Sequence, residues 1–155
     1  MSNSAYRTGV NGKSTDIDEL FPGGSTGELR WESGKEYVLV KVVSVGIADG
    51  VGGYCTGTDN TVSVTASLGT GNRCVCVNNT GETVAVGYYF WGLKKGLGYA
   101  AATAGDDWAA GEELTSGIST WLGSTGPAVT EFSHGVALSV SDNVTIANNS
   151  VLWDM

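Results

Sequence analysis

Residues 28–45 read ELRWESGKEYVLVKVVSV, and this stretch decides the fold class. Two runs rich in β-branched and aromatic residues flank Ser33-Gly34, a pattern that predicts a β-hairpin with its turn at these two residues. Successive side chains of a strand point to opposite faces. In the second run the two faces are therefore expected to carry Tyr37, Leu39 and Lys41 on one side and Val38, Val40 and Val42 on the other.

Further short strands are predicted on both sides of turn-like segments downstream. Residues 61–68 (TVSVTASL) alternate, and residues 73–93 indicate two strands around the turn 78–81, with Cys74 and Cys76 on one face and Val75 and Val77 on the other. Residues 97–105 and 112–123 predict short strands, and residues 134–153 predict two more across Asp142-Asn143. No helical period and no long repeat is present, so we expect an all-β fold, a single compact barrel or sandwich of short antiparallel strands.

Composition agrees with one β-domain. The chain has 155 residues, of which 24 are glycine, 2 are proline and 15% are charged, below the usual level of about 25%. The net charge of −8 argues against a nucleic-acid partner and against binding to acidic membranes. Residues 1–21 contain no apolar signal-peptide core, so synthesis in the cytoplasm without a signal peptide is expected. The odd count of three cysteines in a chain without a signal peptide predicts reduced thiols.

Residues 1–28 differ from the rest and are expected to form an extended N-terminal arm before a β-domain at 29–155. The arm is polar and rich in glycine, and the segment STDIDELF at 14–21 is compatible with one short helical turn or an extended chain. We expect the arm to be disordered in the free protein and ordered on a partner. Its predicted anchors on that partner are Tyr6, Arg7, Ile17, Leu20 and Phe21.

The matches of this sequence to known phosphate-binding and metal-binding motifs are weak. GVNGKST at 9–15 lacks the first glycine of a phosphate loop, because that position holds Arg7. A calcium loop counted from Asp16 fails, because its sixth position is Phe21 and its twelfth is Gly27. Cys55, Cys74, Cys76 and His134 have poor spacing for zinc, so neither a metal nor a cofactor is expected.

Catalytic arrangements are equally unconvincing, and the protein is not expected to be an enzyme. His134 has Ser133 as its neighbour, which points to the opposite face of a strand, and no nucleophile signature accompanies it. Asp106-Asp107 and Glu112-Glu113 lie beside glycines and are expected to be solvated turn residues. The sequon Asn78-Asn79-Thr80 carries little meaning without a secretion signal.

The most unusual segment is GYYFWGL at 87–93, a strand pattern with bulky residues on both faces. One face can fill a barrel, and the other needs cover from the chain or from another subunit. Tyrosine and tryptophan are enriched at interfaces. A subunit contact is therefore predicted for Tyr88, Tyr89, Phe90 and Trp91.

Residues 28–139 resemble small tailed-bacteriophage virion proteins, the capsid decoration or cement proteins. The resemblance lies in the order of GKEYVLVKV, GYYFWGLKKG, AAATAGDDWAAGEELT and GVALS. It implies a β-barrel-like domain that docks on the capsid exterior, clamps neighbouring major capsid protein subunits and is commonly a homotrimer. It supplies no catalytic residues, and it does not cover the arm.

Other functions remain open from the residues alone. A head or tail fibre module has the same glycine-rich β composition. A carbohydrate-binding module would use Trp91, Trp108 and Trp121 as sugar platforms. A small hydrolase would use His134 or a pair of acids.

Overall fold

The computed structural model describes residues 26–56, 63–66, 74–102, 108–116, 121–124, 133–142 and 148–155. Within these ranges the secondary structure consists of strands without an α-helix, so the predicted all-β fold is confirmed. The strands are β1 (Leu29–Glu32), β2 (Lys35–Val42), β3 (Gly52–Cys55), β4 (Ser63–Thr65), β5 (Cys74–Val77), β6 (Tyr89–Tyr99), β7 (Glu113–Ser116), β8 (Trp121–Ser124), β9 (Gly135–Ala137) and β10 (Ser150–Asp154).

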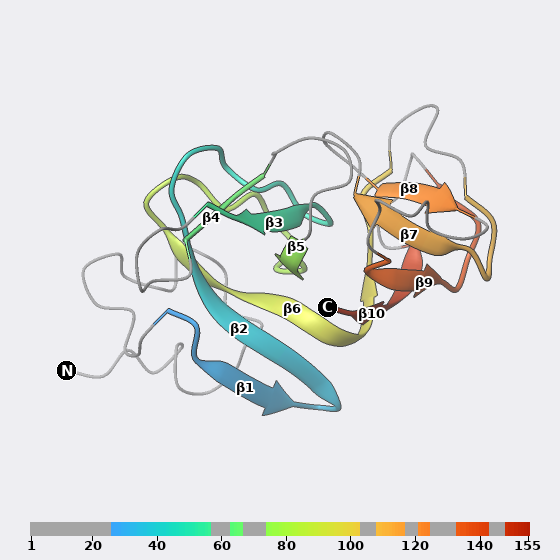
Figure 1. Cartoon of the computed structure of the whole chain (residues 1–155), viewed down its shortest axis with the longest axis horizontal. Coiled ribbons are helices and arrows are strands. Elements are labelled where there is room, and N and C mark those ends of the chain that lie inside the picture. The colour runs from blue at the N-terminus through green and yellow to red at the C-terminus, as the bar shows by residue number, and fades with distance from the viewer. Residues whose placement is uncertain are drawn as a thin grey trace.

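Five strands close into a barrel. They pair in the order β2, β4, β3, β5 and β6, and β6 also pairs with β2, which completes the ring (Figure 1). Antiparallel pairing was predicted throughout, but β2 and β4 run parallel, with Lys41 beside Ser63. The difference arises because the chain forms β3 before it returns to insert β4 between β2 and β3, an order that local sequence patterns do not encode.

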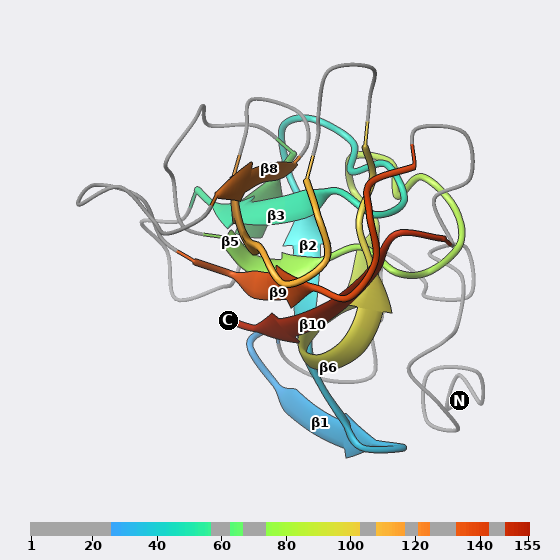
Figure 2. The same cartoon turned by 90° about the vertical axis from the view of Figure 1, so that its right-hand side faces the viewer.

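Apart from β1, the remaining strands β7 to β10 extend the sheet from the second half of β6, and we call them the extra strands. Strand β6 pairs with β2 in its first part and with β10 from Lys95 to Tyr99, and β9, β7 and β8 follow in that order. The extra strands lie in front of the barrel in Figure 2. A break was expected between the strands at 87–93 and 97–105, but Gly96, with φ of 109°, lets one strand of 11 residues continue through both.

The predicted hairpin at 28–45 is confirmed. β1 and β2 pair antiparallel, and Ser33 and Gly34 form the turn with φ of 52° and 75°. Two consecutive positive φ values are typical of a type I′ turn, whose twist matches that of the paired strands. Leu39 accepts a bond from Gly27 N–H at 2.7 Å and donates one to Glu28 at 2.9 Å, so the last residues of the predicted arm are already tied to β2.

The barrel interior is filled by one of two hydrophobic clusters. The valines of one face of β2 meet the side chains of the other barrel strands there, as the alternation in the sequence predicts. Gly92 faces this interior, where an added methyl group would overlap the side chain of Cys76. The buried members of the interior cluster are Val38, Val40, Val42, Ile47, Val51, Val64, Cys76, Val84, Phe90 and Ala101.

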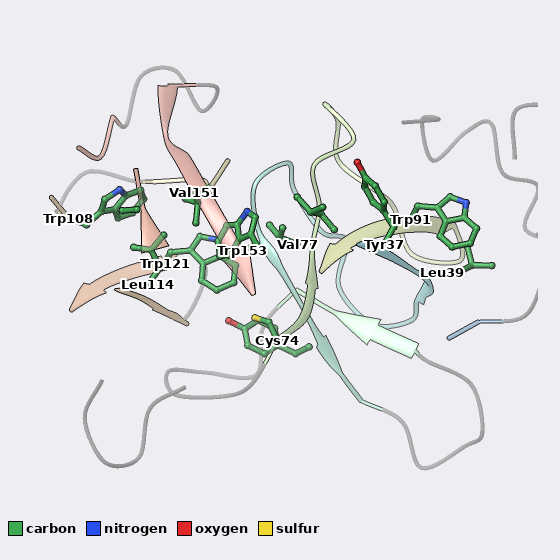
Figure 3. Close-up of a cluster of buried hydrophobic side chains, with 14 residues drawn as sticks. Tyr37, Leu39, Cys74, Val77, Trp91, Trp108, Leu114, Trp121, Val151 and Trp153 are labelled. Carbon is green, nitrogen blue, oxygen red and sulfur yellow. The ribbon is translucent and has the colours of Figure 1, made fainter. Parts of the chain in front are cut away.

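The second cluster contains the other face of β2 and joins the barrel to the extra strands. Tyr37, Leu39 and Trp91 lie at one end, and Trp121 and Trp153 lie among the extra strands (Figure 3). The rings of Trp121 and Trp153 are tilted against each other with centroids 4.6 Å apart. Burial of aromatic side chains of this size is the largest hydrophobic contribution that single residues make to a core.

The prediction that Cys74 and Cys76 share a face was wrong. Gly53 pairs with Cys76, but the next residue, Tyr54, pairs with Cys74, so Val75 is an extra residue in a β-bulge. The bulge reverses the alternation at this point. Cys74 therefore belongs to the cluster around Trp121, and Cys76 lies in the barrel interior.

Candidate functional site

His134 is buried and has a structural partner. Its side chain is 1% exposed, and its Nε2 accepts a hydrogen bond of 2.9 Å from the backbone N–H of Cys74. Because Nε2 accepts this bond, the neutral ring carries its proton on Nδ1. The ring meets Trp121 edge-on with centroids 5.5 Å apart. His134 thus positions β5 against the extra strands, whereas its neighbour Ser133 is exposed.

The three cysteines are free thiols in different surroundings. Cys55 is exposed, while Cys74 and Cys76 are buried. Burial raises the pKa of Cys74 to about 12 and also raises the pKa of Cys76. Both buried cysteines therefore remain neutral thiols at physiological pH, which is the unreactive form toward substrates and metals.

The acidic residues Glu112 and Glu113 lie in different local surroundings. The carboxylate of Glu112 accepts a bond of 3.0 Å from the N–H of Ala109 and closes the turn before β7. Glu113 lies on β7, where its Cα partners are Val136 and Ser124. The pair does not form the facing carboxylates of a hydrolase, and the other acidic pair, Asp106-Asp107, lies outside the described residues.

Asn78 is the acceptor residue of a glycosylation sequon but is completely buried. Its Nδ2 donates to the carbonyls of Ile47 and Glu82, both at 2.8 Å, and its Oδ1 accepts from the N–H and the Oγ1 of Thr80. The carboxamide therefore holds together the loop between β5 and β6. This side chain is not accessible for attachment of a sugar.

The aromatic strand is covered on both faces by the chain itself. Phe90 is fully buried in the barrel, and Trp91 is 2% exposed beneath the guanidinium of Arg30, which lies 4.6 Å from its ring centroid. Tyr88 and Tyr89 are partly buried, and the ammonium of Lys41 lies 5.2 Å from the ring of Tyr89. A subunit contact thus stays a prediction for these two tyrosines, whereas Phe90 and Trp91 have almost no surface left for a partner.

The tryptophans proposed as sugar platforms are core residues. Trp91, Trp108 and Trp121 are all at most 3% exposed, so that part of the carbohydrate-binding alternative was wrong. Sequence reasoning did not single out Trp31, which is 66% exposed on β1. Its position two residues before the turn at 33–34, on the strand that begins the sheet, was the signal that could have identified it.

We consider two of the exposed apolar surfaces as candidate interaction sites. The first is a row across three neighbouring strands, in which Leu152 on β10 pairs with Leu97 on β6 and with Val136 on β9. These three residues are 53% (Leu97), 49% (Leu152) and 36% (Val136) exposed. We call them the outer row. Apolar side chains gathered in this way are typical of a surface that binds another protein.

The second surface is the outer edge of β1, where Leu29 and Trp31 are exposed, together with an adjoining groove. The groove has a volume of about 370 Å³ and runs between the start of β1 and the residues that follow β10. Its lining is mainly apolar apart from one lysine, and consists of Gly27, Leu29, Val38, Cys74, Val75, Lys94 and Met155. We call the strand edge and the groove together the edge site.

The predicted arm anchors Tyr6, Arg7, Ile17, Leu20 and Phe21 lie outside the described residues, so their role stays a prediction. Among the residues that are described, no group of three or more metal-ligating side chains comes together. In the same part of the chain, no helix has the length and apolar character needed to cross a membrane. No family model matches the chain, and comparisons with curated proteins and with solved structures gave no significant match.

Proposed function

We propose that this protein is a virion structural protein that binds the outer surface of an assembled phage capsid and stabilises it. The observation that best supports an assembly role is the outer row, in which Leu97, Leu152 and Val136 are aligned by strand register and remain exposed. We propose the capsid as the partner because the order of the sequence segments at 28–139 resembles that of capsid decoration proteins. Among the residues considered for catalysis, His134 has a structural role, because its ring accepts the hydrogen bond from Cys74.

The mechanism of stabilisation is mass action. A protein that binds the assembled shell, and not its free subunits, lowers the free energy of the shell by its own binding free energy. At a concentration about 100 times its dissociation constant, each occupied site contributes about 2.7 kcal/mol. Many copies on one shell therefore produce a large total effect from modest individual contacts, and the protein needs no catalytic residue or cofactor to do this.

The test combines the purified protein with shells assembled from the major capsid protein of the same genome. We expect co-sedimentation with expanded shells and a higher temperature of shell disruption. Leu152→Asp should weaken binding about tenfold or more, because burial of one leucine contributes about 1.5–3 kcal/mol. Val86→Asp is the matched control, since Val86 is also 49% exposed but lies outside the outer row.

The outcomes separate the proposal from its rivals. Absence of a capsid gene from the genome, or equal shell binding by Leu152→Asp and wild type, would overturn the proposed role of the outer row. Binding to tail or fibre assemblies instead of shells would favour a fibre module. Sedimentation of the free protein as a monomer at all concentrations would contradict the predicted homotrimer. Single copies would then make the contact with the shell.

A further inference from the structure

His134 is the only histidine of the chain, and its buried ring lies where the barrel meets the extra strands. Its Nε2 accepts the hydrogen bond from the backbone N–H of Cys74 on β5, and the ring meets that of Trp121 on β8 edge-on. Histidine is the side chain whose ordinary pKa lies between pH 5 and 8. A change of side-chain charge in this range is therefore expected at this contact.

Protonation of the ring is incompatible with the hydrogen bond from Cys74. The neutral ring carries its proton on Nδ1, so a second proton binds at Nε2, the atom that now accepts the bond. The imidazolium ring has a donor at both nitrogen atoms and no acceptor. Two donors would then face each other across the 2.9 Å between Nε2 and the backbone nitrogen of Cys74, at a buried position.

The backbone of His134 is held in the sheet and cannot move away to relieve this contact. Its N–H donates to the carbonyl of Leu114 on β7, and its carbonyl accepts from the N–H of Asp154 on β10, both at 2.9 Å. These two bonds fix residue 134 between neighbouring extra strands. The relief therefore has to come from the other side, where β5 separates from the ring and takes Cys74 out of the cluster around Trp121.

The titratable groups on the neighbouring elements leave the direction of this effect unchanged. β5 and β8 carry no charged residue. Among the extra strands, Asp154 on β10 is paired with Lys95 at 3.3 Å, and Glu113 lies on β7. On the barrel side the titratable neighbours are the thiol of Cys74 and the phenol of Tyr54, which forms a hydrogen bond to that thiol. A nearby carboxylate changes the pH at which the ring takes up a proton, but it does not replace the acceptor that the backbone N–H loses.

We propose that His134 is an acid-sensitive switch, which holds β5 against the extra strands while its ring is neutral and releases β5 when the ring is protonated. In the released form the ring takes up a proton near the ordinary pKa of histidine, about 6.5. The stabilisation of the closed form is therefore complete above about pH 6.5 and is lost as the pH falls below that value. With the closed ring neutral throughout, the ratio of released to closed molecules rises about 30-fold between about pH 7.5 and about pH 5.0. The inference concerns this chain alone and does not rest on the proposed capsid function.

The experiment measures hydrogen exchange of two backbone N–H groups by NMR at about pH 7.5 and about pH 5.0. The group under test is the N–H of Cys74. The control is the N–H of Val84, which donates to the carbonyl of Ile47 at 2.9 Å in a bond that involves no histidine. Each rate is divided by the rate expected for an unfolded chain at the same pH, which gives a protection factor. At the lower pH the protection factor of Cys74 should fall at least tenfold, and that of Val84 by less than about threefold.

His134→Gln is the matched variant. The side-chain carbonyl of glutamine is able to accept the hydrogen bond from Cys74, and glutamine does not titrate. The protection factor of Cys74 in this variant should therefore be the same at both pH values. A variant that only removed packing around the ring would not restore protection in this pH-independent way.

Three results would overturn the inference. One is an equal protection factor of Cys74 at the two pH values in the wild type. Another is an equally large fall at Val84, because this would reveal loss of the whole fold instead of a local release. The third is a fall in His134→Gln as large as that in the wild type. The first two results need only the wild type and therefore decide the matter even where the variant does not fold.

Discussion

The backbone N–H of Cys74 donates a hydrogen bond to Nε2 of His134, 60 residues further along the chain, across 2.9 Å. Cys74 begins β5 of the barrel, and His134 directly precedes β9 of the extra strands. A side chain thus supplies the acceptor for the N–H of a strand residue beside the bulge. The bond connects the two parts of the molecule at a fully buried position.

Replacement of His134 by alanine is therefore expected to destabilise the fold. A buried N–H loses its acceptor and a cavity forms beside Trp121, which together should lower the free energy of unfolding by about 2–4 kcal/mol. Urea denaturation followed by tryptophan fluorescence measures this change. Ser133→Ala, at the exposed neighbouring position, should change stability by less than about 0.5 kcal/mol. Equal stability of His134→Ala and wild type would show that the bond contributes nothing.

The three thiols should react with a disulfide reagent at different rates, one rapidly and two slowly. Cys55 is exposed, whereas burial raises the pKa of Cys74 to about 12 and raises that of Cys76 as well. Since the thiolate is the reactive form, an aromatic disulfide reagent at about pH 8 should modify one thiol rapidly and the other two only on unfolding. Cys55→Ser should abolish the rapid phase. Rapid reaction of two or three thiols in the native protein would contradict the buried positions.

Tyr99 should make the protein sensitive to alkali. Its hydroxyl donates to both carboxylate oxygens of Asp49 at 2.8 and 3.0 Å, and burial, followed by contact with Asp49, raises its pKa above the ordinary value of 10.0. The fold thus favours the neutral phenol. The resulting stabilisation is complete below about pH 10 and is lost as the pH rises from there through the raised pKa.

The measurement is the free energy of unfolding at about pH 9 and about pH 11 for wild type and Tyr99→Phe. Wild type should lose more stability over this interval, because the variant has no phenol to ionise at this position. The buried cysteines and Tyr37 affect the pH dependence of stability in both proteins equally. The difference in stability loss between wild type and Tyr99→Phe therefore reports on Tyr99. An identical loss in the two proteins would mean that the contact with Asp49 does not persist in solution.

Local patterns predicted the elements whose partners lie nearby in the sequence. The hairpin at 28–45 depends on a two-residue turn and on strict alternation, and both faces of β2 are placed as predicted. The bulge at Val75 was not predictable, because it depends on the strand that pairs with β5 and not on the residues of β5 themselves. The same holds for the parallel neighbours β2 and β4.

The candidate sites were less predictable than the fold. Trp91 looked like an interface residue because the cover that Arg30 provides comes from a different strand. The outer row became visible only through the register that brings Leu97, Leu152 and Val136 together from three strands. Sequence indicates which residues are apolar, but the pairing of distant strands determines which of them share a surface.

The position of β10 in the sheet bears on the order in which the protein can be built during translation. β10 is the last of these ten strands to leave the ribosome, yet it lies between β6 and β9 and supplies Trp153 to the packing around Trp121. A nascent chain that lacks residues 150–154 has two unpaired strand edges and an incomplete core. Sheets that depend on pairing between strands distant in the sequence fold slowly and pass through aggregation-prone intermediates. Chaperone demand during synthesis should therefore be concentrated at the completion of the last strand.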